Sequence, residues 1–180
     1  YALSLYMSRN LAYAIMAGLD KVIAYMENLK FGERELDYFK RKGYPDTLIN
    51  YLKNFKFTGN IYAIPDGTPV FPNEPLITVK APLNEAQIIE TDLLNFFNHG
   101  SLIATRSRRI TDAAGNRGVM EFGARRAQGG DAATNGAKYA YISGCIGTSC
   151  YETGKRFGVP ILGTMAHSHI MKYDTEYEAF

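Results

Sequence analysis

After residue 118 the sequence repeats one pattern three times, and this repeat constrains the fold more than any other feature. Each repeat contains a short apolar stretch, a glycine in the turn that follows, and then a helix candidate. The apolar stretches are residues 119–122, 142–146 and 159–162, and the helix candidates are residues 131–141, residues 149–157 and a third that begins near Lys172. Short strands that alternate with helices indicate parallel βα units, which belong to an α/β barrel or to an open α/β sheet.

The sequence pattern of residues 1–115 differs from this repeat. It predicts an α+β domain that precedes the βα region of residues 116–180. Apolar residues at helical spacing predict a first helix over residues 19–29. Further helices are expected over residues 33–42, 46–54, 85–98 and 102–113, with Asn84 as the N-cap of the third of these and His99 at its end. Runs of β-branched and aromatic residues predict a small antiparallel sheet from residues 60–64, 68–71 and 76–80.

Charge and cysteine content narrow the class of protein. With 20 basic and 18 acidic residues and no long basic block, nothing in the chain calls for nucleic acid. Two cysteines are too few for a disulfide framework. No apolar run approaches the roughly 20 residues that cross a bilayer. We therefore expect a globular, cytoplasmic protein, and because the sequence starts at Tyr1 we expect it to be part of a longer one.

Three loops at the predicted strand ends carry residues suited to chemistry, because active sites of parallel α/β folds form at the carboxyl ends of strands. In the first loop, the guanidinium groups of Arg125 and Arg126 suit a phosphate or carboxylate, and the ring of Phe122 suits stacking on a flat ligand. The alternative is that the ring lies in the core and that both arginines pair with Glu121 or Asp131.

The second and third loops hold hydroxyls, a thiol and two histidines. Ser149 would cap the helix that follows it, where free amide groups attract anions. Cys150 fits a structural role more simply than a nucleophilic one, since no base is marked beside it. In the third loop, His167 and His169 would ligate a metal in a metal-dependent hydrolase, or one of them would act as a nucleophile or acid–base group. A structural role for either histidine also stays open.

Taken together, these loops and several upstream segments resemble the nicotinate phosphoribosyltransferase family. The segments that carry the resemblance are FGARRAQ (122–128), GTS (147–149), FGVP (157–160) and GTMAHS (163–168), preceded in family order by IYAIP (61–65), FPNEPL (71–76) and LIAT (102–105). The resemblance covers nearly the whole chain. It implies a type II phosphoribosyltransferase fold, in which an α+β N-terminal domain precedes an irregular α/β barrel, with only the first barrel strands in this sequence.

The resemblance also implies an activity. Members of this family join nicotinate to 5-phosphoribosyl 1-diphosphate, giving nicotinate mononucleotide and diphosphate in NAD salvage, coupled to ATP hydrolysis. They work as homodimers with shared active sites. Mg²⁺ accompanies 5-phosphoribosyl 1-diphosphate and ATP, and its ligands are expected outside this sequence. The fragment by itself is therefore expected to be inactive.

Individual residues match functional positions of the family. Phe122 matches the aromatic residue that packs on the pyridine ring, and Arg125 matches the arginine that faces nicotinate and the ribose phosphate. Thr164 and Ser168 match polar groups near the nicotinate carboxylate, and Ser149 in the second loop is also expected to bind substrate.

Two further positions concern phosphate groups. His167 matches the histidine that ATP phosphorylates, and Arg9 matches the arginine that reaches a phosphate in the neighbouring subunit. The alternatives are a nicotinamide phosphoribosyltransferase, a metal-dependent barrel hydrolase and a non-catalytic module. An enzyme that selects nicotinamide over nicotinate is favoured by a carboxylate in the second loop, which accepts the amide N–H. Residues 144–150 contain no carboxylate. Quinolinate phosphoribosyltransferase fits less well, because it needs no phosphorylatable histidine.

Overall fold

The computed structural model describes residues 2–3 and 12–180. Internal contacts divide the chain into two compact units, an N-terminal unit of residues 1–105 and a C-terminal unit of residues 106–180. The division falls inside helix α4 (Leu83–Ala114), whereas the expected domain boundary at residues 115 and 116 follows directly after that helix. Helix α4 is therefore the element through which the two units are joined.

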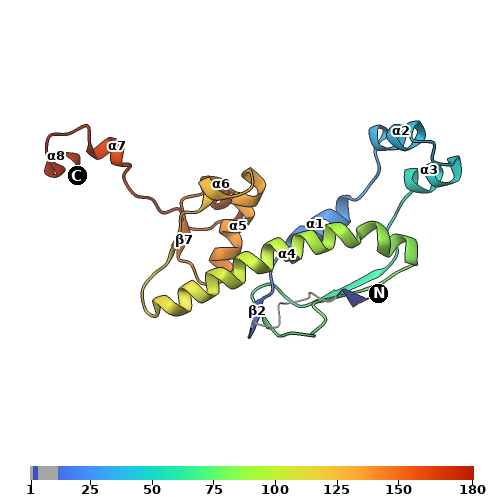
Figure 1. Cartoon of the computed structure of the whole chain (residues 1–180), viewed down its shortest axis with the longest axis horizontal. Helices are drawn as coiled ribbons and strands as arrows, with labels where there is room; N and C mark the ends of the chain where they lie inside the picture. The colour runs from blue at the N-terminus through green and yellow to red at the C-terminus, as the bar shows by residue number, and fades with distance from the viewer. Residues whose placement is uncertain (1, 4–11) are drawn as a thin grey trace. The chain divides into compact units, whose positions relative to one another are not determined.

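The N-terminal unit begins with short strands and three short helices. In chain order these are β1 (Ala2–Leu3), β2 (Ala14–Ile15), α1 (Leu19–Asn28), α2 (Glu33–Arg41) and α3 (Asp46–Lys53). Strands β3 (Asn60–Ala63), β4 (Pro69–Val70) and β5 (Ile77–Lys80) then precede α4. Helices α2 and α3 lie side by side in Figure 1 and share a small apolar cluster of Leu36, Ile49 and Leu52. The three helices expected before residue 55 are thus confirmed.

The three predicted β runs do not form one sheet. Strand β5 lies between β1 and β3 in an antiparallel sheet, with Ile61 opposite Val79. Strand β4 instead pairs with β2 in a separate antiparallel ladder, where Val70 lies opposite Ala14. The prediction was therefore wrong for residues 68–71, because their partner is a two-residue strand too short to give a period-2 pattern.

One apolar core joins α1, α4 and the β5 sheet. Alternate residues of β5, Ile77 and Val79, are buried, as expected for a strand with one face toward a core. Helix α4 contributes Ile89, Leu93 and Phe97, which recur every four residues and so lie along one face of the helix. Helix α1 runs beside α4 in Figure 1 and adds Val22 to the same cluster.

Helix α4 is continuous where the sequence predicts an interruption. It begins at Leu83, so Asn84 is not its N-cap, and it runs through His99 and Gly100 without a break. The glycine at position 100 is explained by a close approach of two backbones. A Cβ atom at Gly100 would lie 2.4 Å from the carbonyl oxygen of Ala17, a distance that no side chain tolerates. Gly100 is therefore a packing glycine inside a helix and not a helix terminator.

Gly100→Ala is expected to destabilise the protein by about 2 kcal/mol or more, because the new methyl group overlaps the Ala17 backbone and the chain must shift to accommodate it. The matched control is Gly136→Ala in another helix, where nothing lies within 4 Å of the added atom. That change should stabilise by about 0.5 to 1 kcal/mol through helix propensity alone. Urea denaturation checks both, and a Gly100 variant as stable as the wild type would contradict this packing.

The C-terminal unit contains short parallel strands that alternate with helices. After α4 come β6 (Met120–Glu121), the 3₁₀ turn η1 (Ala124–Arg126), α5 (Gly130–Ile142), β7 (Gly147–Thr148), α6 (Tyr151–Phe157), α7 (His167–Ile170) and α8 (Glu176–Ala179). Strand β6 pairs in parallel with β7, and Thr148 of β7 forms a parallel bridge with Ile161. The predicted parallel βα order is confirmed.

Two of the expected boundaries in this unit were wrong. Residues 142–146 are not a strand, since Ile142 ends α5 and a turn at Gly144, with φ of 104°, leads into β7. The last helix begins at Glu176, after Thr175, whose hydroxyl accepts a hydrogen bond from the Glu178 amide, and not near Lys172.

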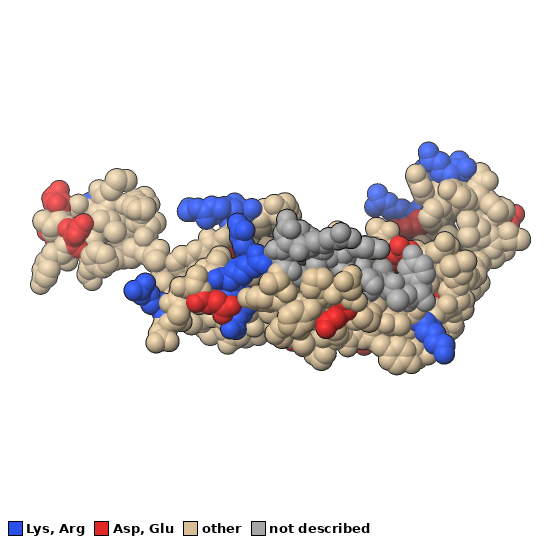
Figure 2. Space-filling view, turned by 60° about the horizontal axis from the view of Figure 1, so that its bottom comes forward, with Lys and Arg blue, Asp and Glu red and all other residues tan. Residues whose placement is uncertain are grey.

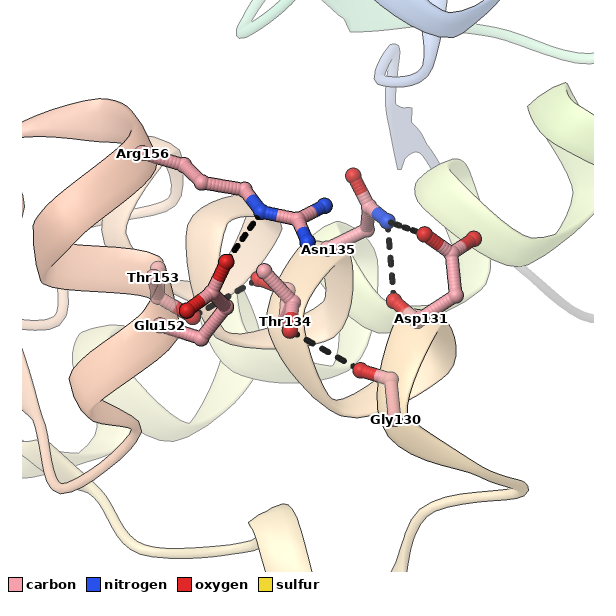
Figure 3. Close-up of polar contacts among 7 residues, drawn as sticks. All are labelled: Gly130, Asp131, Thr134, Asn135, Glu152, Thr153 and Arg156. Atoms are coloured by element: carbon pink, nitrogen blue, oxygen red, sulfur yellow. Dashed lines mark hydrogen bonds and ion pairs between the residues drawn. The ribbon is translucent and has the colours of Figure 1, made fainter.

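Helices α5 and α6 are joined by buried polar groups (Figure 3). The Thr153 hydroxyl donates to the carbonyl of Thr134 at 2.9 Å, and both side chains are buried. Asn135 donates to the carbonyl and carboxylate of Asp131, one turn earlier in α5. The bond from Thr153 to Thr134 joins α6 to α5, whereas the Asn135 bonds lie within α5. Both helices flank the strand ends that carry the candidate loops.

Candidate functional site

Glu121, the last residue of β6, links the first two candidate loops. Its Oε1 atom accepts a hydrogen bond from the Gly123 amide at 2.5 Å, and its Oε2 atom accepts one from the Thr148 hydroxyl at 2.6 Å. Its main-chain carbonyl accepts a bond from the Ser149 amide at 3.1 Å. Because Glu121 and Thr148 are paired residues of neighbouring parallel strands, these groups lie together at the carboxyl ends of β6 and β7.

The third loop leaves a strand end that is tied to the same place. The Thr148 amide donates to the Pro160 carbonyl at 3.0 Å, and the Leu162 amide donates to the Thr148 carbonyl at 2.9 Å. Thr148 itself is fully buried. Three consecutive chain segments therefore meet at Thr148, as the sequence pattern predicts for loops at the carboxyl ends of parallel strands.

Arg125 lies in η1, directly after this junction. The turn is closed by the Arg126 amide, which donates to the Gly123 carbonyl at 2.8 Å. Arg125 and Arg126 are both exposed, and within the described part of the chain no carboxylate forms an ion pair with either. The alternative in which Glu121 or Asp131 neutralises these arginines is thus not what the structure contains. Two unpaired cations beside a strand end suit an anionic ligand.

The other residues of the first two loops fit this setting in part. Phe122 is half-buried, so one part of its ring stays accessible. Ser149 is exposed and does not cap α6, whose N-cap is Cys150. No described side chain caps α6, and the Thr148 hydroxyl accepts a hydrogen bond from the amide of the N-cap residue itself, Cys150, at 2.9 Å. The sequence-based prediction that Ser149 caps the following helix was therefore wrong. The Ser149 hydroxyl is not used for capping.

The third-loop residues are presented on the surface. Thr164, His167 and Ser168 are exposed, and His167 is the first residue of the one-turn helix α7. Between residues 12 and 180, no hydrogen bond or ion pair joins these side chains to the first two loops. Arg9 lies outside the described residues. The substrate roles assigned to these positions stay predictions.

The two cysteines differ in environment. Cys145 is buried, and this burial raises the pKa of its thiol, with the nearby Glu121 carboxylate raising it further. A raised pKa keeps the thiol neutral and poorly nucleophilic at physiological pH. Cys145 therefore behaves as a core residue of the turn before β7.

A metal site was one sequence-based alternative for His167 and His169. Over residues 2–3 and 12–180, no three His, Cys, Asp or Glu side chains gather as metal ligands would. The His169 ring packs edge-on against Tyr173, with ring centroids 5.2 Å apart. The hydrolase alternative gains no support from these contacts.

Cationic side chains form small separate groups on the face drawn in Figure 2 and not one continuous basic surface. On the face drawn in Figure 2, Lys and Arg side chains lie in small groups, several with Asp or Glu beside them. Among the ion pairs of the described residues is that of Arg156 with Glu152 on α6. Any anion binding on this face would thus depend on individual arginines and not on a broad basic surface. Separately, no described helix has the length and apolar character that crossing a membrane requires.

Comparison with known proteins agrees with the fold and the loops. A family model for the nicotinate phosphoribosyltransferase N-terminal domain matches residues 6–98. The nicotinate phosphoribosyltransferase of Bacillus subtilis is 47% identical over 169 residues, which cover 93% of this chain and 34% of that protein. The nicotinate phosphoribosyltransferase pncB2 of Mycobacterium tuberculosis (strain ATCC 25618 / H37Rv) is 41% identical over 170 residues, covering 94% of this chain and 37% of that protein.

A solved structure shares the fold. The crystal structure of human nicotinic acid phosphoribosyltransferase superposes with a TM-score of 0.83 at 29% identity, covering 90% of this chain and 33% of that one. The fold and its strand-end loops thus place the chain among mixed helix and strand proteins of the phosphoribosyltransferase class. Since the family model covers more than half of the sequence, the chain belongs to the nicotinate phosphoribosyltransferase family. It spans about a third of the length of the relatives it matches.

Proposed function

We propose that the protein containing this chain joins nicotinate to 5-phosphoribosyl 1-diphosphate, giving nicotinate mononucleotide and diphosphate in NAD salvage. The observation that carries the proposal is the junction of Glu121 and Thr148, which holds the Phe122–Arg125 loop beside the Ser149 loop at two parallel strand ends. Family membership supports the choice of substrates.

The residue types in these loops suit the chemistry. Breaking the bond between ribose C1 and diphosphate builds positive charge on the sugar and negative charge on the leaving group, so positioning and electrostatics supply most of the catalysis. The free guanidinium of Arg125 would hold an anionic substrate group, and the accessible part of Phe122 would pack on the pyridine ring. The hydroxyls of Ser149, Thr164 and Ser168 would orient the nicotinate carboxylate.

Further parts of the proposal depend on the rest of the protein. Mg²⁺ would arrive with 5-phosphoribosyl 1-diphosphate and ATP, and the described residues offer it no ligand cluster of their own. The short parallel strands would be the first of an irregular α/β barrel of the type II phosphoribosyltransferase kind. We also propose ATP coupling through phosphorylation of His167, a homodimer in which Arg9 reaches the partner's site, and a cytoplasmic location.

The full-length protein is expected to prefer nicotinate over nicotinamide by roughly tenfold or more in kcat/KM, the scale on which one mismatched polar group lowers turnover. The second loop contains no carboxylate to accept an amide N–H, and the Glu121 carboxylate, which is bonded to this loop through Thr148, already accepts a protein hydrogen bond at each oxygen. Turnover of the two substrates side by side, with and without ATP, checks this preference.

Three outcomes of that assay are informative. Equal or faster turnover of nicotinamide would contradict the preference and favour a nicotinamide phosphoribosyltransferase. No turnover of either substrate by the full-length protein would contradict the proposed activity and favour a non-catalytic module. Unchanged turnover without ATP would leave the synthesis in place but reject its coupling to ATP.

A further inference from the structure

The Glu121 side chain forms hydrogen bonds with both loops of the proposed site. It stands at the end of β6, and each of its carboxylate oxygens accepts a hydrogen bond, from Gly123 on one side and from Thr148 on the other. Hydrogen bonds to an ionised carboxylate are about twice as strong as neutral ones. The two bonds of Glu121 therefore add to the restraint that the two-residue strand pairing gives the loops.

The bond to Gly123 determines the direction of the chain after β6. A Cβ atom at Gly123 would lie 2.8 Å from Oε1 of Glu121, so the carboxylate occupies the space beside this residue. The next step is η1, closed by the bond from the Arg126 amide to the Gly123 carbonyl. The Glu121 carboxylate thus binds Gly123, and Gly123 in turn closes the 3₁₀ turn that contains Arg125.

The bond to Thr148 extends the restraint to the second loop. The Thr148 hydroxyl donates to Glu121 and at the same time accepts from the Cys150 amide at 2.9 Å. The Ser149 amide, between them in sequence, donates to the Glu121 carbonyl. The backbone on both sides of the Ser149 hydroxyl is therefore anchored, directly or through Thr148, to Glu121.

We propose that Glu121 is a positioning residue that holds the Arg125 and Ser149 loops in the arrangement needed for substrate. This inference rests on the proposed function. A positioning role fits because each carboxylate oxygen accepts a hydrogen bond from one of the two loops. Nor does Glu121 form an ion pair with Arg125 in the described part of the chain. Glu121 acts through the positions of other groups.

The test compares Glu121→Ala with Glu121→Gln in the full-length protein. Glutamine keeps an acceptor oxygen for the Gly123 amide, and its NH₂ group donates to the Thr148 hydroxyl, which has a second lone pair free to accept. We expect Glu121→Ala to lower kcat/KM for nicotinate about 30-fold, since a misplacement of 1 Å costs on the order of 100-fold. Glu121→Gln should stay within about threefold of the wild type.

Two further variants separate positioning from general stability. Glu152→Ala is the matched control, because it removes a carboxylate of the same unit whose bond partner among the described residues is Arg156, on its own helix. It should leave kcat/KM unchanged. If Glu121→Ala does not fold, Thr148→Val takes its place, since at nearly constant volume it removes one of the two hydrogen bonds of the carboxylate, together with the bond from the Cys150 amide.

A double-mutant cycle gives the deciding readout. If Glu121 works in part through Arg125, the loss caused by Glu121→Ala or Thr148→Val should be several-fold smaller in the Arg125→Ala background than in the wild-type background. A loss of equal size in both backgrounds would overturn the proposal, as would wild-type activity of Glu121→Ala or a Gln variant as impaired as the Ala variant. A wild-type protein without activity would instead reject the proposed function.

Discussion

Arg125→Ala is expected to lower kcat/KM for nicotinate by about 30- to 1,000-fold, which corresponds to the roughly 2 to 4 kcal/mol of a lost charge-assisted contact in a transition state. The same change should leave the melting temperature within a few degrees of the wild type. The physical reason is exposure, since Arg125 is a surface residue of η1 and has no ion-pair partner among the residues that the structure describes. Removing it costs the fold almost nothing.

Steady-state kinetics of the full-length protein and a thermal melt check the two halves of this expectation. Arg156→Ala is the matched control, because it removes an exposed guanidinium of the same unit whose partner is Glu152 on α6. Its kcat/KM should stay at the wild-type value. An Arg125 variant that unfolds would indicate a structural role, and one with unchanged kinetics would remove Arg125 from the proposed site.

Local pattern was sufficient to predict much of this fold. Helix α1 follows from apolar residues at helical spacing, and the parallel pairing of β6 with β7 follows from strands that alternate with helices. Both depend on residues close in sequence. The position of the candidate loops at strand ends follows from the same pattern, and the bonds at Thr148 confirm it.

The errors arose where distant residues decide the structure. The local pattern predicts a helix end at Gly100, and only the close contact with Ala17 shows why a glycine is needed inside the helix. Strand β4 finds its partner in β2, more than fifty residues earlier in the chain. Tertiary contacts of this kind override local propensity.

In the candidate site, too, some residues could be predicted from local sequence and others depend on contacts between distant residues. Arg125 and Phe122 could be proposed from their residue types, because guanidinium groups and aromatic rings are common ligands of anions and flat rings. Glu121 and Thr148 could not, since their importance comes from a side-chain bond between residues 27 apart in sequence. The signal that was present is small: an acidic residue at a strand end, two positions before a glycine.

His167→Asn is expected to abolish incorporation of phosphate from ATP, while slow nucleotide synthesis without ATP continues. A neutral imidazole attacks a terminal phosphoryl group directly, whereas the amide of asparagine does not. His167 is exposed at the start of α7, so an external phosphoryl donor has access to its ring. Transfer to the ribose needs no phosphohistidine, and the ATP-independent reaction should therefore survive the substitution.

His169→Asn is the matched control, two residues along the same helix. The ring of His169 packs against Tyr173, with centroids 5.2 Å apart, and this contact gives it a local structural role. Its substitution should change both activities far less than that of His167. Labelling with ATP that carries radioactive terminal phosphate, followed by acid treatment, measures the phosphohistidine, because a phosphate on imidazole is lost in acid. Acid-labile label that is retained in His167→Asn and lost in His169→Asn would move the phosphate acceptor to His169.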